Sequence, residues 1–290
     1  MPQAEVWSVG RLLQWTTEFL KGRGSDSPRL DAEVLLAQSL GCQRIELYTS
    51  FESEPDEPAR AAFRELVRRR AEGEPVAYLV GKREFYSLTF QVTPDVLIPR
   101  PETELLVVAL LDLAKPPSNR PLAVCDVGTG SGVLAVCAAK HRDCRVTAVD
   151  VSPAALAVAR ANAEAHGVAE RIDFLAGDLL AAVPAAARFD FVLSNPPYVS
   201  TADFARLAPT VRNFEPRVAL EAGPQGTGVI ARLIPQAAER LVPGGHLLLE
   251  ISPMVHDAVR ALVAADERLE LGPTIKDLGR RPRVVQAQKK

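Results

Sequence analysis

The segment Ser194-Asn195-Pro196-Pro197-Tyr198 carries the side chains in this sequence that are best suited to chemistry. It follows the apolar run 189–193, which is typical of a buried strand. Proline has no N–H group for a strand ladder, so the chain must leave the sheet at Asn195. Two proline rings stiffen the turn, and the Asn195 carboxamide and the nearby carbonyls then form a rigid cluster of neutral hydrogen-bond acceptors. Such a cluster, with the aromatic face of Tyr198 beside it, suits a flat substrate that carries an NH2 group. The alternative is a proline-rich turn without chemistry.

A second candidate is the glycine-rich loop Asp126-Val127-Gly128-Thr129-Gly130-Ser131-Gly132. Its glycines let the backbone turn tightly and approach a ligand closely. The spacing is G-x-G-x-G, whereas the dinucleotide fingerprint G-x-G-x-x-G needs a glycine where Val133 stands. No Gly-Lys-Ser/Thr follows, which excludes a P-loop. The acid at Asp126 suits a ligand with a positively charged amino group rather than a pyrophosphate.

Two further acids follow the next two predicted strands. Asp150 ends the strand 145–149, where it can accept hydrogen bonds from both hydroxyl groups of a ribose. Asp178 follows the strand 172–175, where it can receive the amino group of an adenine. Together with the loop, these acids fit S-adenosylmethionine, so we predict a nucleoside-type cofactor. The alternative is that the acids are only helix caps and turn formers.

These residues lie within alternating strands and helices that run from Leu122 towards the C-terminus. The alternation predicts an α/β fold with a doubly wound, mostly parallel, seven-stranded sheet and helices on both faces. Ligands of such sheets bind beyond the carboxyl ends of the strands, which is where Asp126, Asp150, Asp178 and Asn195 fall. The predicted strands are 122–127, 145–149, 172–175, 189–193, 246–251, 269–271 and 284–288.

The chain before this sheet divides into two parts. Residues 1–81 are predicted to form a small helical domain, and residues 82–98 a β-hairpin that links it to a catalytic domain of residues 99–290. Ser8 can cap a first helix that ends at Lys21, and Pro58 begins a later helix with a row of arginines. This row is either a solvated helix face or a patch for a partner that carries phosphates. Its members are Arg60, Arg64, Arg68, Arg69 and Arg70.

Composition and charge are those of an ordinary globular protein. The chain has 290 residues, 47% of them hydrophobic and 24% charged, and a formal net charge of −2. That charge gives no general attraction to nucleic acid or to an anionic membrane. Four cysteines without a C-x-x-C motif and four histidines without metal-ligand spacing predict reduced thiols and no metal site. With no signal core and no run of about 20 apolar residues, we expect a cytoplasmic protein that does not contact membranes.

With these motifs the chain resembles the class I methyltransferases, which have a Rossmann-like fold. More closely, it resembles the HemK/PrmC family, whose members methylate the glutamine side-chain amide (N5) of peptide-chain release factors. The most specific carrier is the run Ile98-Pro99-Arg100-Pro101-Glu102-Thr103-Glu104, together with the helical domain before it. The segments 75–81 and 85–88, Glu215-Pro216, Ala219-Leu220 and Gly223 also look like the family. Leu179 departs from it, since many relatives carry Trp beside the adenine, and the smaller side chain leaves less stacking area.

The resemblance implies a glutamine amide nitrogen as the methyl acceptor. The Asn195 side-chain oxygen and the Pro196 carbonyl would accept its two hydrogens and place the nitrogen in line with the methyl group, while Tyr198 packs against the planar amide. Catalytic residues would then be Asn195, Pro196 and Tyr198, and Pro197 and Arg100 would join them in binding the substrate. The implied cofactor-binding residues are Asp126, Gly128, Thr129, Gly130, Ser131, Gly132, Asp150, Asp178, Leu179 and Asn195.

The implied partner is a release factor, whose Gly-Gly-Gln tip the helical domain and the hairpin would clamp. We expect a monomer that does not bind nucleic acid directly and that forms S-adenosylhomocysteine as its product. One alternative is amino-methylation of a nucleic-acid base, a DNA adenine or an rRNA guanine, against which the slightly negative charge argues. The other alternative is a cofactor-binding module without catalysis, and the intact Asn-Pro-Pro-Tyr sequence argues against it.

Overall fold

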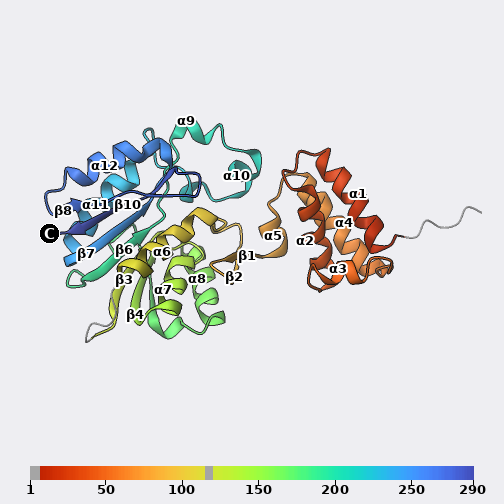
Figure 1. The fold of residues 1–290 in the computed structure, drawn as a ribbon, viewed down its shortest axis with the longest axis horizontal. Helices are drawn as coiled ribbons and strands as arrows, with labels where there is room; N and C mark the ends of the chain where they lie inside the picture. Colours follow the sequence, from red (N-terminus) through yellow and green to blue (C-terminus); the bar gives the residue numbers. More distant parts are fainter. Residues whose placement is uncertain (1–6, 115–119) are drawn as a thin grey trace, which may run out of the picture. The chain divides into compact units, whose positions relative to one another are not determined.

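A computed structural model describes residues 7–114 and 120–290, and its chain forms two compact units. The smaller unit comprises the chain up to Lys82 together with Pro209–Phe214, and the larger unit comprises Arg83–Ala208 and Glu215–Lys290 (Figure 1). The first six residues of the predicted helical domain lie outside the described residues. Within the described ranges, no helix is both long and apolar enough to cross a membrane.

The smaller unit is helical, as predicted. Helix α1 (Val9–Lys21) begins at Ser8, whose hydroxyl accepts the Arg11 N–H, and this confirms the predicted cap. Helix α4 (Glu57–Ala71) is capped by Asp56, and Pro58 lies in its first turn. The remaining helices are α2 (Pro28–Leu40), α3 (Glu46–Thr49), α5 (Val76–Val80) and α10 (Pro209–Phe214). The helices of residues 7–82 share a core that includes Leu13, Leu20, Leu35, Leu36, Leu47 and Phe63.

The arginines of α4 are already paired with carboxylates. Arg64 pairs with Glu57 on the same helix, and Arg70 pairs with Asp31 of α2 at 2.8 Å. These partners favour the solvated helix face over the phosphate-binding patch, because a phosphate would have to displace a carboxylate from each guanidinium group. Exposed pairs such as Arg64 with Glu57 contribute little to stability. The other three pairings are Arg60 with Glu54 and Glu57, Arg68 with Glu65 and Glu72, and Arg69 with Glu74.

A β-hairpin of strands β1 (Lys82–Phe85) and β2 (Leu88–Gln91) follows the helical unit. Tyr86 and Ser87 at its tip both have positive φ, +49° and +59°, as a two-residue hairpin turn requires. Phe85 and Phe90 are buried in the core of the larger unit. The backbone of Gln91 exchanges two hydrogen bonds with the Asn162 side chain, at 2.7 and 3.0 Å. The hairpin from Arg83 on is thus packed onto the larger unit.

The larger unit contains the expected mostly parallel sheet. Its strand order is β5-β4-β3-β6-β7-β10-β8; β10 is antiparallel to β7 and β8, and an eighth short strand, β9, pairs with β10. The order runs outward from β3 through β4 to β5 and then reverses to β6 and β7, so a topological switch point lies between β3 and β6. The strands are β3 (Leu122–Val127), β4 (Cys144–Asp150), β5 (Ile172–Ala176), β6 (Phe189–Ser194), β7 (Leu241–Glu250), β8 (Leu269–Leu271), β9 (Ile275–Lys276) and β10 (Pro282–Lys289).

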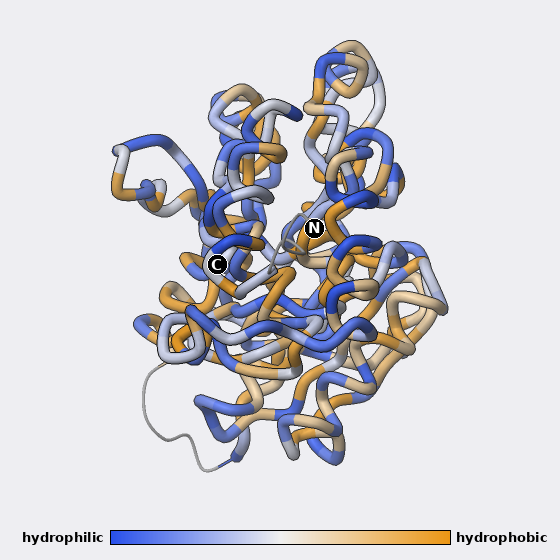
Figure 2. The backbone as a smooth tube through the Cα atoms, turned by 90° about the vertical axis from the view of Figure 1, so that its right-hand side faces the viewer, coloured by the Kyte–Doolittle hydropathy of each residue, from blue (hydrophilic) through white to orange (hydrophobic). Residues whose placement is uncertain are grey.

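Helices cover both faces of the sheet, because successive strand residues point to opposite sides. In β7, Leu248 packs into the core beneath α6 and α7, whereas Leu247 and Leu249 pack with α11 and α12. Figure 2 colours the backbone by hydropathy, with hydrophobic residues in orange and hydrophilic residues in blue. The helices are α6 (Glu104–Leu113), α7 (Val133–His141), α8 (Pro153–Ala165), α9 (Thr201–Phe204), α11 (Gly228–Arg240) and α12 (His256–Ala264), with 3-10 turns η1 (Pro101–Thr103), η2 (Ala169–Arg171), η3 (Arg217–Ala219) and η4 (Pro253–Val255).

One strand begins earlier than predicted. We expected 246–251, but β7 starts at Leu241, which pairs with Phe189 before the register shifts. The shift accommodates Pro243, Gly244 and Gly245, residues that resemble a turn in the sequence. The strand ends at Glu250, one residue before the predicted end.

Candidate active site

A cavity of about 410 Å³ lies at the switch point, where β3 and β6 end. Val127 of β3 pairs with Ser194 of β6, and the Ser194 hydroxyl donates to the Val127 carbonyl at 2.7 Å. This pairing brings the glycine loop and the Asn-Pro-Pro segment to the same opening. The predicted site residues on the cavity wall are Gly128, Thr129, Gly130, Ser131, Asp150, Asp178, Leu179, Asn195, Pro196 and Pro197. Asp126, Gly132, Tyr198 and Arg100 are not on that wall.

The glycine loop is fixed to the end of β4. The Gly130 N–H donates to Asp150 Oδ2 at 2.9 Å, in a left-handed conformation with φ of +54°. Gly132 has φ of +82°, and a Cβ atom there would lie 3.0 Å from the Ala159 Cβ of α8. Glycine at these two positions therefore allows the turn and the close packing of the loop against α8.

Asp126 lies behind the loop and holds it. Its side chain is fully buried, and Oδ2 accepts the Thr129 hydroxyl at 2.7 Å and the Ala135 N–H at 3.1 Å. Burial raises the pKa of Asp126 to about 7, the two hydrogen bonds oppose the rise, and the charge of Asp150 adds to it. Within the described chain, Oδ1 has no hydrogen-bond partner. Asp126 thus shapes the loop and the start of α7, and one buried oxygen remains to accept a donor.

Asp150 stands at the opening of the cavity. Its two oxygens accept backbone N–H groups from both sides, Gly130 and Ser152, each at 2.9 Å. Ser152 also caps α8 through the Ala155 N–H. A carboxylate has about four lone-pair sites, so Asp150 keeps acceptor capacity towards the cavity.

Asp178 and Leu179 form the wall after β5. Asp178 is half exposed and pairs with Arg232, which also lines the cavity. Leu179 has φ of +55°, a conformation that is rare for a branched hydrophobic residue. Its side chain belongs to the core beneath α11 while it lines the cavity. Backbone strain of this kind is often found at functional sites.

Asn195 is the first residue after β6, where the sequence predicts that the chain leaves the sheet. Its Nδ2 atom donates to the Thr103 hydroxyl oxygen at 3.1 Å. Thr103 is 2% exposed and ends the turn η1 in the Pro101-Glu102-Thr103 run. Because the NH2 group is engaged with Thr103, the carbonyl oxygen is the acceptor that Asn195 has left to offer.

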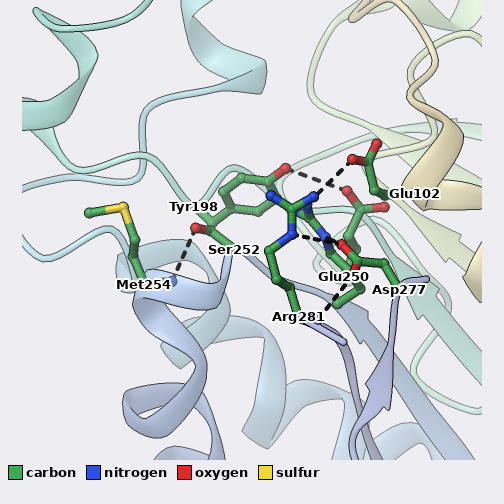
Figure 3. Close-up of polar contacts among 8 residues, drawn as sticks. Glu102, Tyr198, Glu250, Ser252, Met254, Asp277 and Arg281 are labelled. Carbon is green, nitrogen blue, oxygen red and sulfur yellow. Dashed lines mark hydrogen bonds and ion pairs between the residues drawn. The ribbon is translucent and has the colours of Figure 1, made fainter. Parts of the chain in front are cut away.

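Tyr198 packs against the protein core. Its ring packs into the core that contains Val255 and Ile251, and its hydroxyl donates to Glu250 Oε1 at 3.4 Å (Figure 3). Burial raises the pKa of Tyr198 above its usual value, so the phenol stays a neutral donor. Glu250 is 1% exposed, and burial raises its pKa to about 7.

Arg100 is held away from the cavity wall by an ion pair. Its guanidinium group contacts Glu215 Oε1 at 2.5 Å, and the Glu215 side chain is 1% exposed. Glu215 Oε2 accepts the Ile98 N–H at 3.2 Å. Two motifs that are far apart in the sequence, 98–104 and 215–216, are joined in this way beside the cavity.

Sequence reasoning missed three residues of this arrangement: Thr103, Glu215 and Glu250. The first two stand in motifs that we quoted, but no local spacing links Thr103 to Asn195 or Glu215 to Arg100. Glu250 had a usable signal, because it ends an apolar strand run at the carboxyl edge, as Asp126 and Asp150 do. In the ranges that the structure covers, no group of three or more His, Cys, Asp and Glu side chains could hold a metal ion.

Two family models match parts of this chain. Residues 11–81 match the family model described as PrmC N-terminal domain, and residues 102–210 match the methyltransferase small domain. A release factor glutamine methyltransferase from Rhodopirellula baltica is 50% identical over 98% of this chain and 97% of its own length. One from Koribacter versatilis is 41% identical over 94% and 95%.

Among solved structures, the T. thermophilus 16S rRNA N2 G1207 methyltransferase, in complex with AdoMet and guanosine, has a TM-score of 0.53. It is 22% identical, and the match covers 72% of this chain and 50% of that one, so the likeness shows the fold alone. The full-length identity to the first two relatives shows more than the fold. The chain belongs to the release factor glutamine methyltransferase family.

Proposed function

We propose that this protein transfers a methyl group from S-adenosylmethionine to the side-chain amide nitrogen (N5) of the glutamine in the Gly-Gly-Gln segment of a release factor. The observation that carries the proposal is that Asn195 and Pro196 line the same cavity as the glycine loop and Asp150. Family membership supplies the substrate class.

The residues of the cavity suit this cofactor. Asp150 has acceptor capacity for ribose hydroxyls, and the backbone of 128–131 lines the cavity where the Gly130 turn lets a ligand approach. Asp178 and Leu179 would flank the adenine, whereas Asp126, which is buried behind the cavity wall, would act by holding the loop through Thr129. When bound, S-adenosylmethionine supplies a methyl group on a positively charged sulfur.

The chain's own contribution is to orient a poor nucleophile. An amide nitrogen is weak because its lone pair is delocalised into the carbonyl group. The Asn195 Oδ1 and the Pro196 carbonyl would accept its two hydrogens, fix its position and stabilise the positive charge that develops on it. A strong base is not required, because the nitrogen becomes acidic once it is alkylated. Tyr198 is not on the cavity wall. Its hydroxyl donates to Glu250, and this contact would hold the end of the Asn-Pro-Pro-Tyr segment in place.

We further propose that the helical unit and the hairpin clamp the Gly-Gly-Gln tip of the release factor. Charge supports protein over nucleic acid as the substrate, because the α4 arginines are paired with carboxylates and the net charge is −2. A release factor acts on the ribosome, so the proposed reaction is cytoplasmic. The enzyme is also proposed to act as a monomer.

The test uses purified full-length enzyme and S-adenosylmethionine labelled on its methyl group. We expect label in a purified release factor and none in the same factor after Gln→Ala substitution in its Gly-Gly-Gln segment. Ribosomal RNA and DNA, supplied in parallel, should remain unlabelled. Label in either nucleic acid but not in the release factor would reject the proposal in favour of base methylation, and no transfer to any of them would favour a non-catalytic module.

A further inference from the structure

Helix α11 holds the segment that follows β5 with side chains from three successive turns. Gln236 Oε1 accepts the Leu180 N–H at 3.1 Å. One turn later, Arg240 donates to the Pro184 carbonyl oxygen at 2.7 Å. Arg232 lies one turn before Gln236, and residues four positions apart share one face of a helix. The backbone of the segment is therefore attached to α11 by Gln236 and Arg240.

Arg232 differs from these two residues in its partner and in its position. Its guanidinium group pairs with Oδ2 of Asp178, which is a side-chain atom rather than a backbone atom. Arg232 and Asp178 both lie on the wall of the cavity, whereas Gln236 and Arg240 do not. More than half of each paired side chain is exposed, so the pair contributes little to stability. The place of Arg232 is better explained by the orientation that it gives to the carboxylate.

The ion pair engages one oxygen of Asp178 and leaves the other. A carboxylate accepts hydrogen bonds and donates none. With Oδ2 engaged by Arg232, Oδ1 is the atom that remains for a ligand at this end of the cavity. Because the guanidinium group restrains the carboxylate, Oδ1 offers its lone pairs from a fixed position. A donor group of the ligand is favoured opposite this oxygen, and an acceptor group is repelled by it.

We propose that Arg232 is a positioning residue that fixes the Asp178 carboxylate, so that the site selects a purine with a 6-amino group over one with a 6-oxo group. This inference rests on the proposed function, in which Asp178 flanks the adenine of the cofactor. The amino group of an adenine donates to the free oxygen. A hypoxanthine ring has an acceptor oxygen at that place, and its nearest donor is the neighbouring N1–H. A carboxylate that turns freely could reach the N1–H, whereas one held by Arg232 stays opposite position 6.

The test measures the affinities of two ligands by calorimetric titration of the full-length protein. One is S-adenosylhomocysteine, and the other is S-inosylhomocysteine, in which an oxygen replaces the 6-amino group. The parent should bind the adenine form about 10- to 100-fold more tightly, because a hydrogen bond to a charged group is replaced by two acceptors that face each other. Arg232→Met removes the cation and should reduce this preference about 3- to 10-fold. Arg232→Lys keeps a cation and should restore most of it.

Arg240→Met is the matched control, because Arg240 lies on the same face of α11 and holds the same segment outside the cavity wall. It should keep the preference of the parent, and circular dichroism should show that all variants are folded. If Arg240→Met and Arg232→Met lose the preference equally, loosening of the segment is the cause, and the role of Arg232 is overturned.

A second comparison asks whether Arg232 acts through Asp178. In Asp178→Asn the carboxamide can turn to offer either a donor or an acceptor, so the preference should be small. Adding Arg232→Met to this variant should then change the preference little further, whereas an equal effect in both backgrounds would show that the two residues act independently. A parent that binds both ligands equally contradicts the selection but leaves the proposed methyl transfer standing. A parent that binds neither ligand contradicts both.

Discussion

The substitution Asn195→Asp tests the orientation of the carboxamide most directly. It keeps the shape and one acceptor oxygen, but it replaces the NH2 that donates to Thr103 with a second acceptor. A carboxylate has no hydrogen to donate, so the contact in which Thr103 accepts from position 195 would be lost unless the Thr103 hydroxyl turned to donate. The new charge must also be desolvated, and it could draw the sulfonium group of the cofactor into an unproductive ion pair.

The expected loss follows from the two acceptors proposed to hold the amide nitrogen. Removing one preorganised hydrogen-bonding group from a water-excluded site typically costs on the order of 10²–10³ in rate, or about 2.7–4 kcal/mol. We therefore expect Asn195→Ala to lose about that much, since only the Pro196 carbonyl remains, and Asn195→Asp to fail nearly as badly. An acceptor of the right shape does not restore the rate if neutrality and direction are what matter.

The assay is single-turnover methylation of a purified release factor, with saturating cofactor so that a change in affinity does not contribute. Circular dichroism and calorimetric titration show whether each variant is folded and binds S-adenosylmethionine. If Asn195→Asp transfers methyl groups at close to the parent rate, Asn195 is not a neutral orienting group and the mechanism is wrong.

Three further predictions concern the cofactor, the helical unit and the join between motifs. Asp150→Ala should weaken S-adenosylmethionine binding by about 1–3 kcal/mol in calorimetric titration, because ligand hydroxyls lose an acceptor; an unchanged affinity would make Asp150 only a loop and helix-cap residue. A chain that begins at Arg83 should keep cofactor binding, since the sheet and the loop are complete, but lose most activity on an intact release factor at low concentration; equal activity would refute the clamp. Glu215→Ala should lower the free energy of unfolding by about 1–3 kcal/mol in denaturant titration, because the buried Ile98 N–H loses its acceptor and the partly exposed Arg100 loses its partner. Arg64→Ala, in an exposed pair, should change it little, and similar effects of the two would contradict a structural role for Glu215.

Much of the fold could be predicted because its signals are local. An apolar run with an acid near its end, such as Leu122–Val127 with Asp126, indicates both a parallel strand and the position of its carboxyl end. Ser8 and Ser152 lie directly before the helices that they cap. The start of β7 was mistaken because the pairing of Leu241 with Phe189 depends on a register shift in the neighbouring strand. A shift of this kind leaves no periodic pattern, whereas Pro243 and the following glycines favour a turn when read alone.

The partners of the candidate site are harder to predict than its residues, because they are determined by the sheet order. Asn195 and Thr103 are 92 positions apart, and Tyr198 and Glu250 are 52 apart. They meet only because β6 lies between β3 and β7, with η1 beside the ends of these strands. The sequence can therefore identify an Asn followed by two prolines, but not which way its amide points. That direction is fixed by the contact with Thr103, which belongs to a turn 92 positions earlier in the chain, so the chemistry proposed for Asn195 depends on the fold as much as on the motif.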